Sequence, residues 1–272
     1  MTESIKHFQK VIWDYYKKYG RHDLPWRTTK DPYKILVSEY MLQQTQVARV
    51  IPKYEAFLKA FPTFQSLAKA SVPDVLQLWQ GLGYNRRALY LKKTAELVCE
   101  KYKGVLPKNP NILVEFPGIG PNTAAAICAY SFNMPVVFIE TNIRRIFIHF
   151  FFQKSRKKIS DADILKLVAE TVDEIYPREW YWALMDYGTY LKTQVENPNR
   201  KSKHYTKQSK FKGSDREIRG KILRILLKNN SISKKKIVVE LEEEKGRVER
   251  VLATLIKDSF IKEKKDIVTF LK

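Results

Sequence analysis

The 272-residue sequence has few residues that bind metals through sulfur or imidazole. Its two cysteines, Cys99 and Cys128, cannot supply the four thiolates of an iron–sulfur or zinc cluster. Its four histidines are scattered without the short spacing of metal ligands. We therefore expect no metal and no cofactor, and both cysteines are predicted to be buried structural thiols.

The sequence also lacks a run of ~18 apolar residues that could span a membrane, and its first residues, MTESIKHFQK, have no signal-peptide core. We expect a cytoplasmic protein. Acidic residues are scarce too: 29 Asp and Glu stand against 50 Lys and Arg, which gives a formal net charge of +21. Such a positive field is tolerated best beside a polyanion. Nucleic acid is the leading expected partner, and a membrane surface is the alternative.

Alternating strand patterns are nearly absent before the C-terminus, and helical periodicity dominates. The sequence therefore predicts an all-α body over residues 1–191. The chain is longer than the usual ~100–200 residues of one domain, so a small appendage is expected. The predicted helices cover 4–18, 32–43, 46–61, 63–70, 73–80, 85–103, 110–115, 121–131, 142–152, 161–174 and 179–191.

The helical pattern fails after the body, and residues 192–214 are interpreted as a basic linker. Residues 215–272 follow as a separate small unit, in which three amphipathic helices precede two short strands around a charged turn. This order is typical of a winged helix, a helix-turn-helix variant that contacts DNA. A simple helical packing module is the alternative.

The segment EFPGIGPNTAAAI is predicted to join two helices through a glycine-containing turn. Gly118 and Gly120 permit close approach of the backbone, and the first amides of the second helix, at Asn122 and Thr123, point toward any anion. A dinucleotide-binding loop must follow a strand, whereas the preceding NILVEF is better interpreted as a short helix. The segment therefore predicts a helix-hairpin-helix phosphate clamp, with an ordinary tight turn as the alternative.

The stretch ILVSEYMLQQ holds one acid, Glu39, inside an apolar helical run. On a helix Glu39 shares a stripe with Ile35, Leu36 and Leu42, so its carboxyl faces the packed side. Burial disfavours the charged form, and the pKa of Glu39 is predicted to rise. The side chain could then hold a proton near neutral pH and release it to a substrate atom. A structural hydrogen bond is the alternative.

The stretch PVVFIETNIRRIF places a second acid, Glu140, directly before the helix-capping residues Thr141 and Asn142. Aligned amide dipoles at a helix N-terminus favour the ionised form, so the pKa of Glu140 is predicted to fall. Support of the helix start is the alternative role. Together, Glu39 and Glu140 predict one protonated and one anionic acid, an arrangement that hydrolyses glycosidic bonds through an oxocarbenium-like state.

Five short motifs carry a resemblance to a known family: LPWR at 24–27, SEYMLQQTQV at 38–47, LWQGLGY at 78–84, FPGIG at 116–120 and ALMDYG at 183–188. Over about residues 24–190 the chain resembles the helix-hairpin-helix base-excision DNA glycosylases, and among them the MutY-type adenine glycosylases. The resemblance implies a repair enzyme that flips adenine out of a mismatch with guanine or 8-oxoguanine and cuts its N-glycosidic bond. Its partner would be mismatched double-stranded DNA, and we expect it to act as a monomer on the nucleoid.

The resemblance also implies residue roles. Glu39 matches the acid that protonates adenine and assists the water, and Asn142 matches the asparagine near the water and sugar. Trp26, Arg27 and Asp186 match the adenine pocket. The residues matching DNA-contacting positions are the loop amides Gln43 and Gln44, the wedge Tyr84, and the hairpin residues Gly118, Gly120, Asn122 and Thr123. A flipped base requires such stacking, amide and phosphate contacts.

The chain departs from the family pattern at several positions. Glu140 replaces an aspartate and is one methylene longer. Asn122 replaces the lysine of lyase-competent relatives, so a Schiff base is not expected and the enzyme should be monofunctional. No cysteine follows Lys192, where the family's iron–sulfur loop would begin, and residues 215–272 do not resemble the family's Nudix-type domain. A glycosylase for thymine or uracil opposite guanine, and a non-catalytic DNA-binding relative, remain alternatives.

Overall fold

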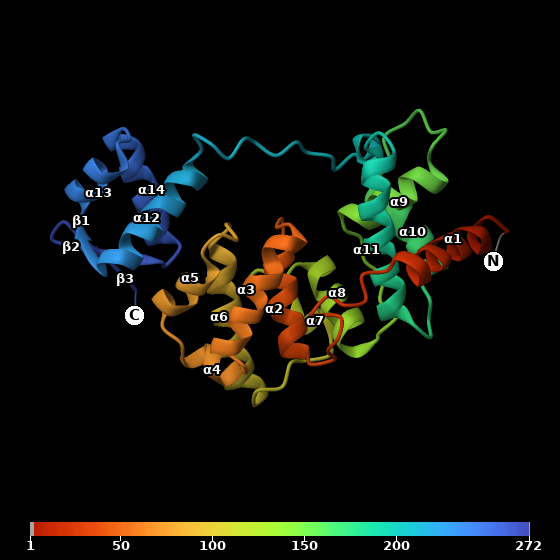
Figure 1. Cartoon of the computed structure of the whole chain (residues 1–272), viewed down its shortest axis with the longest axis horizontal. Helices are drawn as coiled ribbons and strands as arrows, with labels where there is room; N and C mark the ends of the chain where they lie inside the picture. Colours follow the sequence, from red (N-terminus) through yellow and green to blue (C-terminus); the bar gives the residue numbers. More distant parts are fainter. Residues whose placement is uncertain (1–2, 272) are drawn as a thin grey trace. The chain divides into compact units, whose positions relative to one another are not determined.

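The computed structural model describes residues 3–271 and is mostly helical (Figure 1). Every helix predicted for the body is confirmed, with ends within three residues of the predicted ones. The helices of the body are α1 (Glu3–Tyr19), α2 (Pro32–Leu42), α3 (Val47–Ala60), α4 (Phe64–Lys69), α5 (Val72–Trp79), α6 (Arg86–Tyr102), α7 (Pro110–Leu113), α8 (Pro121–Phe132), α9 (Thr141–Phe151), α10 (Asp161–Thr171) and α11 (Pro177–Gln194).

The chain divides into two compact units. The first holds residues 1–39 and 106–207, and the second holds residues 40–105 and 208–272. The division passes through the helical body, between residues 39 and 40 of α2, whereas the sequence predicts a body of residues 1–191 separate from residues 215–272. The second unit joins the small C-terminal part to α3–α6. Which segments fold independently stays a prediction.

The core of the first unit forms where α1 and α9 pack against α11. Phe8 of α1 lies 5.1 Å from the ring of Phe147 and 5.9 Å from that of Trp180, between ring centroids. Gly188 allows α9 and α11 to approach closely, since a Cβ at this position would lie only 2.6 Å from the Cβ of Asn142. The backbone of α9, with Glu140 and Asn142 at its start, is thereby fixed against α11.

The predicted helix-hairpin-helix is present in the first unit as α7 and α8, which pack against each other. Gly118 has a φ of 76°, a left-handed conformation that favours glycine. Pro121 occupies the first turn of α8, where its missing N–H costs nothing. The hairpin therefore ends on an α8 N-terminus that, among the described residues, no side chain caps.

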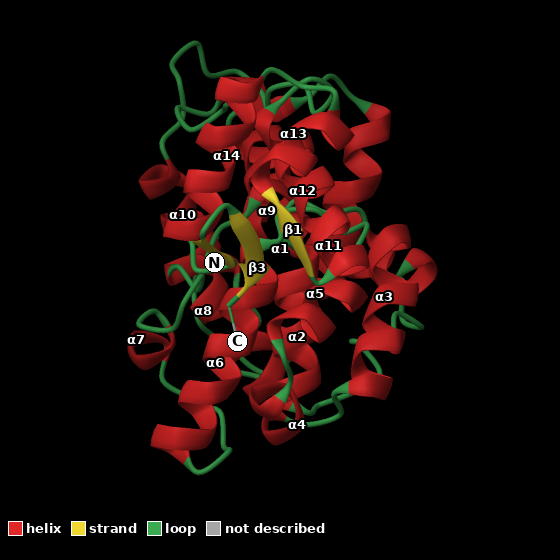
Figure 2. Ribbon diagram, turned by 90° about the vertical axis from the view of Figure 1, so that its left-hand side faces the viewer, coloured by secondary structure: helices red, strands yellow, loops and turns green. Residues whose placement is uncertain are grey.

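The C-terminal part of the second unit consists of α12 (Asp215–Asn229), α13 (Lys234–Leu241), α14 (Lys245–Lys257) and a three-stranded antiparallel sheet. Its strands are β1 (Ser231–Ser233), β2 (Ile261–Lys264) and β3 (Ile267–Phe270), in the order β1-β3-β2, and Figure 2 labels β1 and β3. The three predicted helices are confirmed as α12, α13 and α14. The predicted hairpin is confirmed as well, and it is formed by β2 and β3. Lys265 and Asp266, with φ of 49° and 64°, form the turn between them, as in a type I′ hairpin. The third strand, β1 (Ser231–Ser233), was not predicted, because three residues are too short to show alternation.

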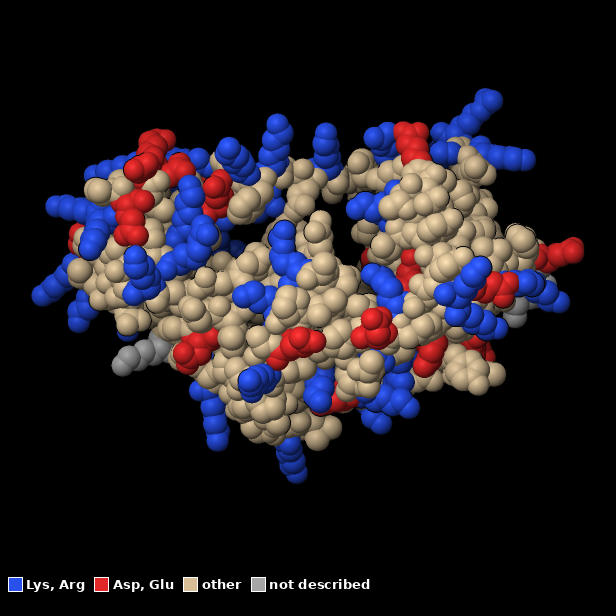
Figure 3. All heavy atoms as spheres, in the orientation of Figure 1, with Lys and Arg blue, Asp and Glu red and all other residues tan. Residues whose placement is uncertain are grey.

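The chain after α11 is ordered for longer than predicted. The linker was predicted to start at residue 192, but α11 ends at Gln194 and a 3-10 helix, η1 (Pro198–Lys201), packs against α9. The side chain of Asn199 is buried and donates a hydrogen bond to the Thr141 carbonyl at 3.0 Å. Lys and Arg side chains stand along the segment between α11 and α12 (Figure 3). The basic character of the predicted linker is thus retained, although its first residues belong to the folded body.

Candidate active site

Glu39 lies near the end of α2 and is only partly exposed. Burial, together with the negative charge of Glu140, raises the pKa of Glu39 from 4.5 to about 8. The prediction of a raised pKa is therefore confirmed. A carboxyl with such a pKa is protonated at neutral pH and can serve as a general acid.

Glu140 is the N-cap of α9. The sequence predicted Thr141 and Asn142 as the capping residues, but both lie in the first turn of the helix. Its Oε1 accepts hydrogen bonds from the amides of Asn142 at 2.5 Å and Ile143 at 3.1 Å. The predicted fall of its pKa is wrong: burial raises the pKa of Glu140 above 4.5, although the two amides and the guanidinium groups of Arg145 and Arg144 oppose the rise. Local dipoles act as expected, but the cost of removing the carboxylate from water outweighs them.

The two carboxyls differ in their surroundings. Glu140 has amide and guanidinium neighbours that stabilise its anion, whereas among residues 3–271 no such group opposes the rise in the pKa of Glu39. Two coupled acids share protons, and the one with less stabilisation of its anion binds the proton first. The arrangement therefore favours a protonated Glu39 beside an anionic Glu140.

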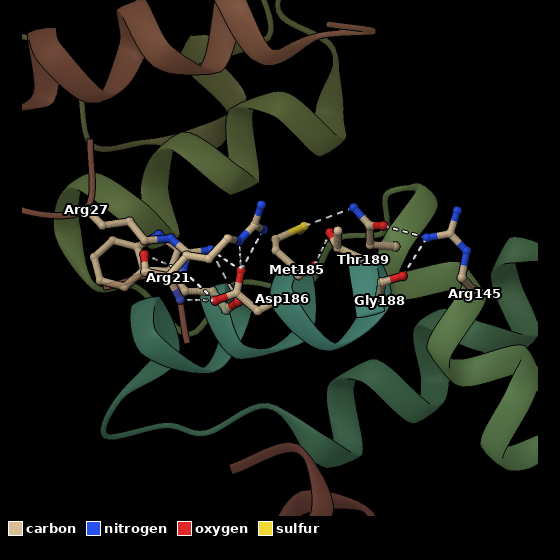
Figure 4. Close-up of polar contacts among 9 residues, drawn as sticks. Arg21, Arg27, Arg145, Met185, Asp186, Gly188 and Thr189 are labelled. Atoms are coloured by element: carbon tan, nitrogen blue, oxygen red, sulfur yellow. Dashed lines mark hydrogen bonds and ion pairs between the residues drawn. The ribbon is translucent and has the colours of Figure 1, made fainter. Parts of the chain in front are cut away.

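Asn142 is held by Arg145, a buried residue that the sequence analysis did not identify. Arg145 Nη1 donates to Asn142 Oδ1 at 2.6 Å and to the Gly188 carbonyl of α11 at 2.7 Å (Figure 4). Asn142 Nδ2 in turn lies 3.8 Å from the sulfur of Met185. Arg145 thus fixes which end of the Asn142 amide faces it, and the amide nitrogen, which has two N–H groups, has a second N–H to donate besides the one directed at Met185.

Asp186 of α11 is buried and accepts from two guanidinium groups (Figure 4). Arg27 donates to it through Nη1 at 2.7 Å and Nη2 at 3.0 Å, and Arg21 donates through Nε at 2.7 Å. Burial alone would raise the pKa of Asp186, but the two arginines hold it below its ordinary value. Trp26, the residue before Arg27 in the sequence, is also buried. The structure thus joins Arg27 and Asp186, while their contact with adenine stays a prediction.

The hairpin residues lie at the start of α8, in the first unit. At Gly120 a Cβ would meet nothing within 4 Å, so the backbone there is open to a ligand. Asn122 is exposed, and its Oδ1 accepts from the Ile139 amide at 3.2 Å, which ties α8 to the segment that ends at Glu140. Thr123 lies in the same first turn. The phosphate clamp stays a prediction that this geometry permits.

Gln43, Gln44 and Tyr84 lie on two loops of the second unit, which a buried arginine joins. Arg87 Nη1 donates to the carbonyls of Tyr40 and Gln43, each at 2.6 Å, and to that of Met41 at 3.0 Å. Its Nη2 donates to the Gly83 carbonyl at 3.1 Å. Arg87 therefore satisfies the last carbonyls of α2 and fixes both loops. Gln44 and Tyr84 have φ of 53° and 47° at the loop tips.

The chain does not offer an iron–sulfur cluster its ligands. Within these 272 residues there are two cysteines, and Cys99 of α6 and Cys128 of α8 belong to different units. Burial raises the pKa of the Cys128 thiol to about 11, which disfavours the thiolate that metals bind. Among residues 3–271, no group of three or more His, Cys, Asp or Glu side chains could hold a metal ion, and no helix is long and apolar enough to cross a membrane.

Of the predicted site residues outside the hairpin, the first unit holds Trp26, Arg27, Glu39, Glu140, Asn142 and Asp186, and the second holds Gln43, Gln44 and Tyr84. An all-helical body with a glycine-containing hairpin and two unlike carboxyls defines a helix-hairpin-helix base-excision protein. A family model described as "HhH-GPD superfamily base excision DNA repair protein" matches residues 37–170.

The similar proteins narrow this class. The adenine DNA glycosylase of Mycobacterium tuberculosis is 30% identical to this chain, and the alignment covers 89% of this chain and 86% of that relative. That of Buchnera aphidicola subsp. Baizongia pistaciae is 37% identical over 68% of this chain, which spans about half, 52%, of that relative. A thermostable thymine-DNA glycosylase structure aligns over 68% of this chain and 86% of its own, with a TM-score of 0.62 and 26% identity. The chain belongs to the HhH-GPD superfamily, among the adenine DNA glycosylases.

Proposed function

We propose that this chain is a monofunctional DNA glycosylase that excises adenine mispaired with guanine or 8-oxoguanine. The observation that carries the proposal is the pair of unlike carboxyls, a Glu39 whose pKa is raised to about 8 beside a Glu140 held by amides and guanidinium groups. Relatives named adenine DNA glycosylase, at 30% and 37% identity, support adenine as the base. On this proposal the enzyme works as a monomer on mismatched DNA of the nucleoid.

The reaction follows from the two acids. Glu39 donates its proton to a ring nitrogen of the flipped adenine, which makes the base a better leaving group. Positive charge then develops at C1′ of the sugar, where Glu140 stabilises it as an anion. Water adds to C1′ and Glu39, now ionised, accepts a proton from it. The bond between sugar and base is broken, and free adenine and an abasic site are the products.

The neighbouring residues orient these steps. Arg145 fixes Asn142 Oδ1 at 2.6 Å, so the Asn142 amide nitrogen is directed to donate, on this proposal toward the water or the sugar. Arg27, oriented by Asp186, and Trp26 would form the wall of the adenine pocket. Asn122 carries no amine at the hairpin, and its side-chain oxygen is already bonded to the Ile139 amide. A covalent Schiff base with the sugar is therefore not expected.

DNA binding would use both units. The uncapped amides of α8, at Asn122 and Thr123 behind Gly118 and Gly120, would bind a phosphate. Gln43, Gln44 and Tyr84 would enter the duplex and offset the few kcal/mol that flipping costs. Because Lys and Arg exceed acids by 21 in the sequence, affinity for duplex DNA should fall steeply with salt.

A second candidate is a pyrimidine glycosylase, because a thymine-DNA glycosylase is among the similar structures. Four duplexes separate the two: adenine opposite guanine, adenine opposite 8-oxoguanine, thymine opposite guanine and uracil opposite guanine. Under single-turnover conditions we expect free adenine from the first two and no base from the others. Release of thymine or uracil would favour the pyrimidine enzyme, and release of no base would indicate a non-catalytic DNA-binding protein.

A further inference from the structure

The two loop tips of the second unit are contacted by residues of the C-terminal segment. Gln208 donates through Nε2 to the Tyr84 hydroxyl and to Gln44 Oε1, the latter at 3.3 Å. Arg216, in the first turn of α12, donates through Nη1 to the same hydroxyl at 2.8 Å. The proposed function assigns Gln44 and Tyr84 to DNA, so the C-terminal segment meets the loops where DNA would.

This contact is anchored by an ion-pair network on α6, the helix that begins just after Tyr84. Asp258, at the end of α14, lies 2.6 Å from Arg86 of α6 and 2.7 Å from Arg219 of α12. Arg219 also lies over the Phe260 ring, 4.7 Å from its centroid. The Asp258 carboxylate thus holds α12 and α14 against α6, next to the GLGY loop. The position of Arg216 is therefore set by the packing of the whole C-terminal part of the second unit against α6.

Arg216 differs from the arginines around it in its partners. Arg86 and Arg219 pair with Asp258, and Arg247 pairs with Asp215. Arg216 is instead held by neutral groups, since its Nη2 donates to the carbonyl and hydroxyl of Ser209 at 2.8 and 3.1 Å. Within residues 3–271, no carboxylate forms an ion pair with it. Its guanidinium is therefore fixed in direction but not neutralised, a state suited to an anionic ligand.

The surroundings carry the same sign. Lys207, Lys210 and Lys212 lie close to Gln208 and Ser209 in the sequence and are exposed, as is Phe211, with 60% of its surface accessible. Lysine and arginine side chains stand along this segment in Figure 3. Basic residues interleaved with an exposed aromatic ring are typical of surfaces that follow a nucleic-acid backbone.

We propose that Arg216, presented by Ser209 and Tyr84, binds a phosphate of duplex DNA beside the place where the loop tips of Gln44 and Tyr84 enter it. The C-terminal part of the second unit then binds DNA at the same place as the loops that carry Gln44 and Tyr84. This inference rests on the DNA-binding part of the proposed function. It does not require adenine to be the excised base.

The test is the affinity of the full chain for a matched duplex and for the same duplex with one adenine opposite guanine, each over a range of salt concentrations. The variant is Arg216→Ala, and the control is Arg224→Ala, which removes the same charge from an exposed position of the same helix. We expect Arg216→Ala to weaken both duplexes about tenfold and to lower the slope of log affinity against log salt by about one. Arg224→Ala should change affinity less than about twofold.

Three results would overturn the proposal: equal effects of Arg216→Ala and Arg224→Ala, a loss confined to the mismatched duplex, or tighter binding by Arg216→Ala. The second would indicate reading of a base edge, and the third an autoinhibitory latch. Tyr84→Phe removes the hydroxyl that orients Arg216, so it should weaken DNA binding less than Arg216→Ala does. In the double variant, Tyr84→Phe should add little to the loss of affinity that Arg216→Ala causes. Since a matched duplex holds no substrate, a failure of adenine excision would refute the proposed function while leaving this binding result intact.

Discussion

Arg27 and Asp186 form a buried two-pronged ion pair across 159 residues of sequence, with Nη1–Oδ2 and Nη2–Oδ1 distances of 2.7 and 3.0 Å. Both side chains are at most 4% exposed, so neither charge has an alternative partner in water. Removing the Asp186 carboxylate leaves the Arg27 guanidinium buried and uncompensated. We expect Asp186→Asn to lower the free energy of unfolding by about 3–5 kcal/mol. Chemical denaturation measures this change.

The control for this prediction is Asp14→Asn, which breaks the exposed Lys10–Asp14 pair on α1. It should leave the denaturation midpoint unchanged, because an exposed pair contributes little. Equal midpoints for Asp186→Asn and wild type would contradict a role for the buried pair in holding Arg27.

The raised pKa of Glu39 predicts a pH-dependent cost to stability. Between 4.5, its ordinary pKa, and about 8, its value here, the folded protein binds a proton that the unfolded chain has lost. Folding stability therefore falls as pH rises through this window, by at most about 1.4 kcal/mol per pH unit. Glu39→Gln cannot ionise and escapes this cost. Its gain in melting temperature over wild type should grow from about pH 5 to about pH 8, and a constant difference would refute the assigned pKa.

Glu140 predicts an asymmetry between two substitutions. Glu140→Gln removes the anion and should lower the single-turnover rate of adenine release by about a hundredfold or more, with DNA binding retained. Glu140→Asp keeps the charge and should retain substantial activity. If Glu140→Gln instead left the rate unchanged and only lowered the melting temperature, Glu140 would be an N-cap of α9 and nothing more.

Arg145 is expected to act through Asn142. Arg145→Lys removes the two-point contact with Asn142 and Gly188, so we expect a rate loss of about tenfold to a hundredfold. In an Asn142→Ala background the same change should cost much less. Arg145 also lowers the pKa of Glu140. If the lysine lowers it less, Glu140 becomes anionic only at higher pH, and the acid limb of the pH–rate profile should move to higher pH.

The control for Arg145→Lys is Arg156→Lys on an exposed loop, which should change neither the rate nor the pH profile. Fully additive losses in the double variant, with an unmoved acid limb, would show that Arg145 serves only the packing of α9 on α11.

Local pattern was sufficient to predict most of the fold. Helix ranges, the hairpin around Gly118 and the burial of Glu39 follow from periodicity, turn chemistry and one misplaced charge in an apolar stripe. Arg87 and Arg145 were missed because each acts on backbone carbonyls more than forty residues away, at Met41 and Gly188. The direction of the Glu140 pKa was wrong for a related reason. Dipoles at a helix start can be inferred from local sequence, whereas desolvation by the rest of the unit cannot.

The central claim is that Glu39 is the general acid of an adenine glycosylase. The most direct test is the single-turnover rate of adenine release from a duplex with adenine opposite 8-oxoguanine, measured for wild type, Glu39→Gln and the exposed control Glu170→Gln. We predict that Glu39→Gln folds and binds DNA as wild type does but releases adenine at least about a hundredfold more slowly, while Glu170→Gln matches wild type. A well-folded Glu39→Gln with a near-normal rate would contradict the assignment.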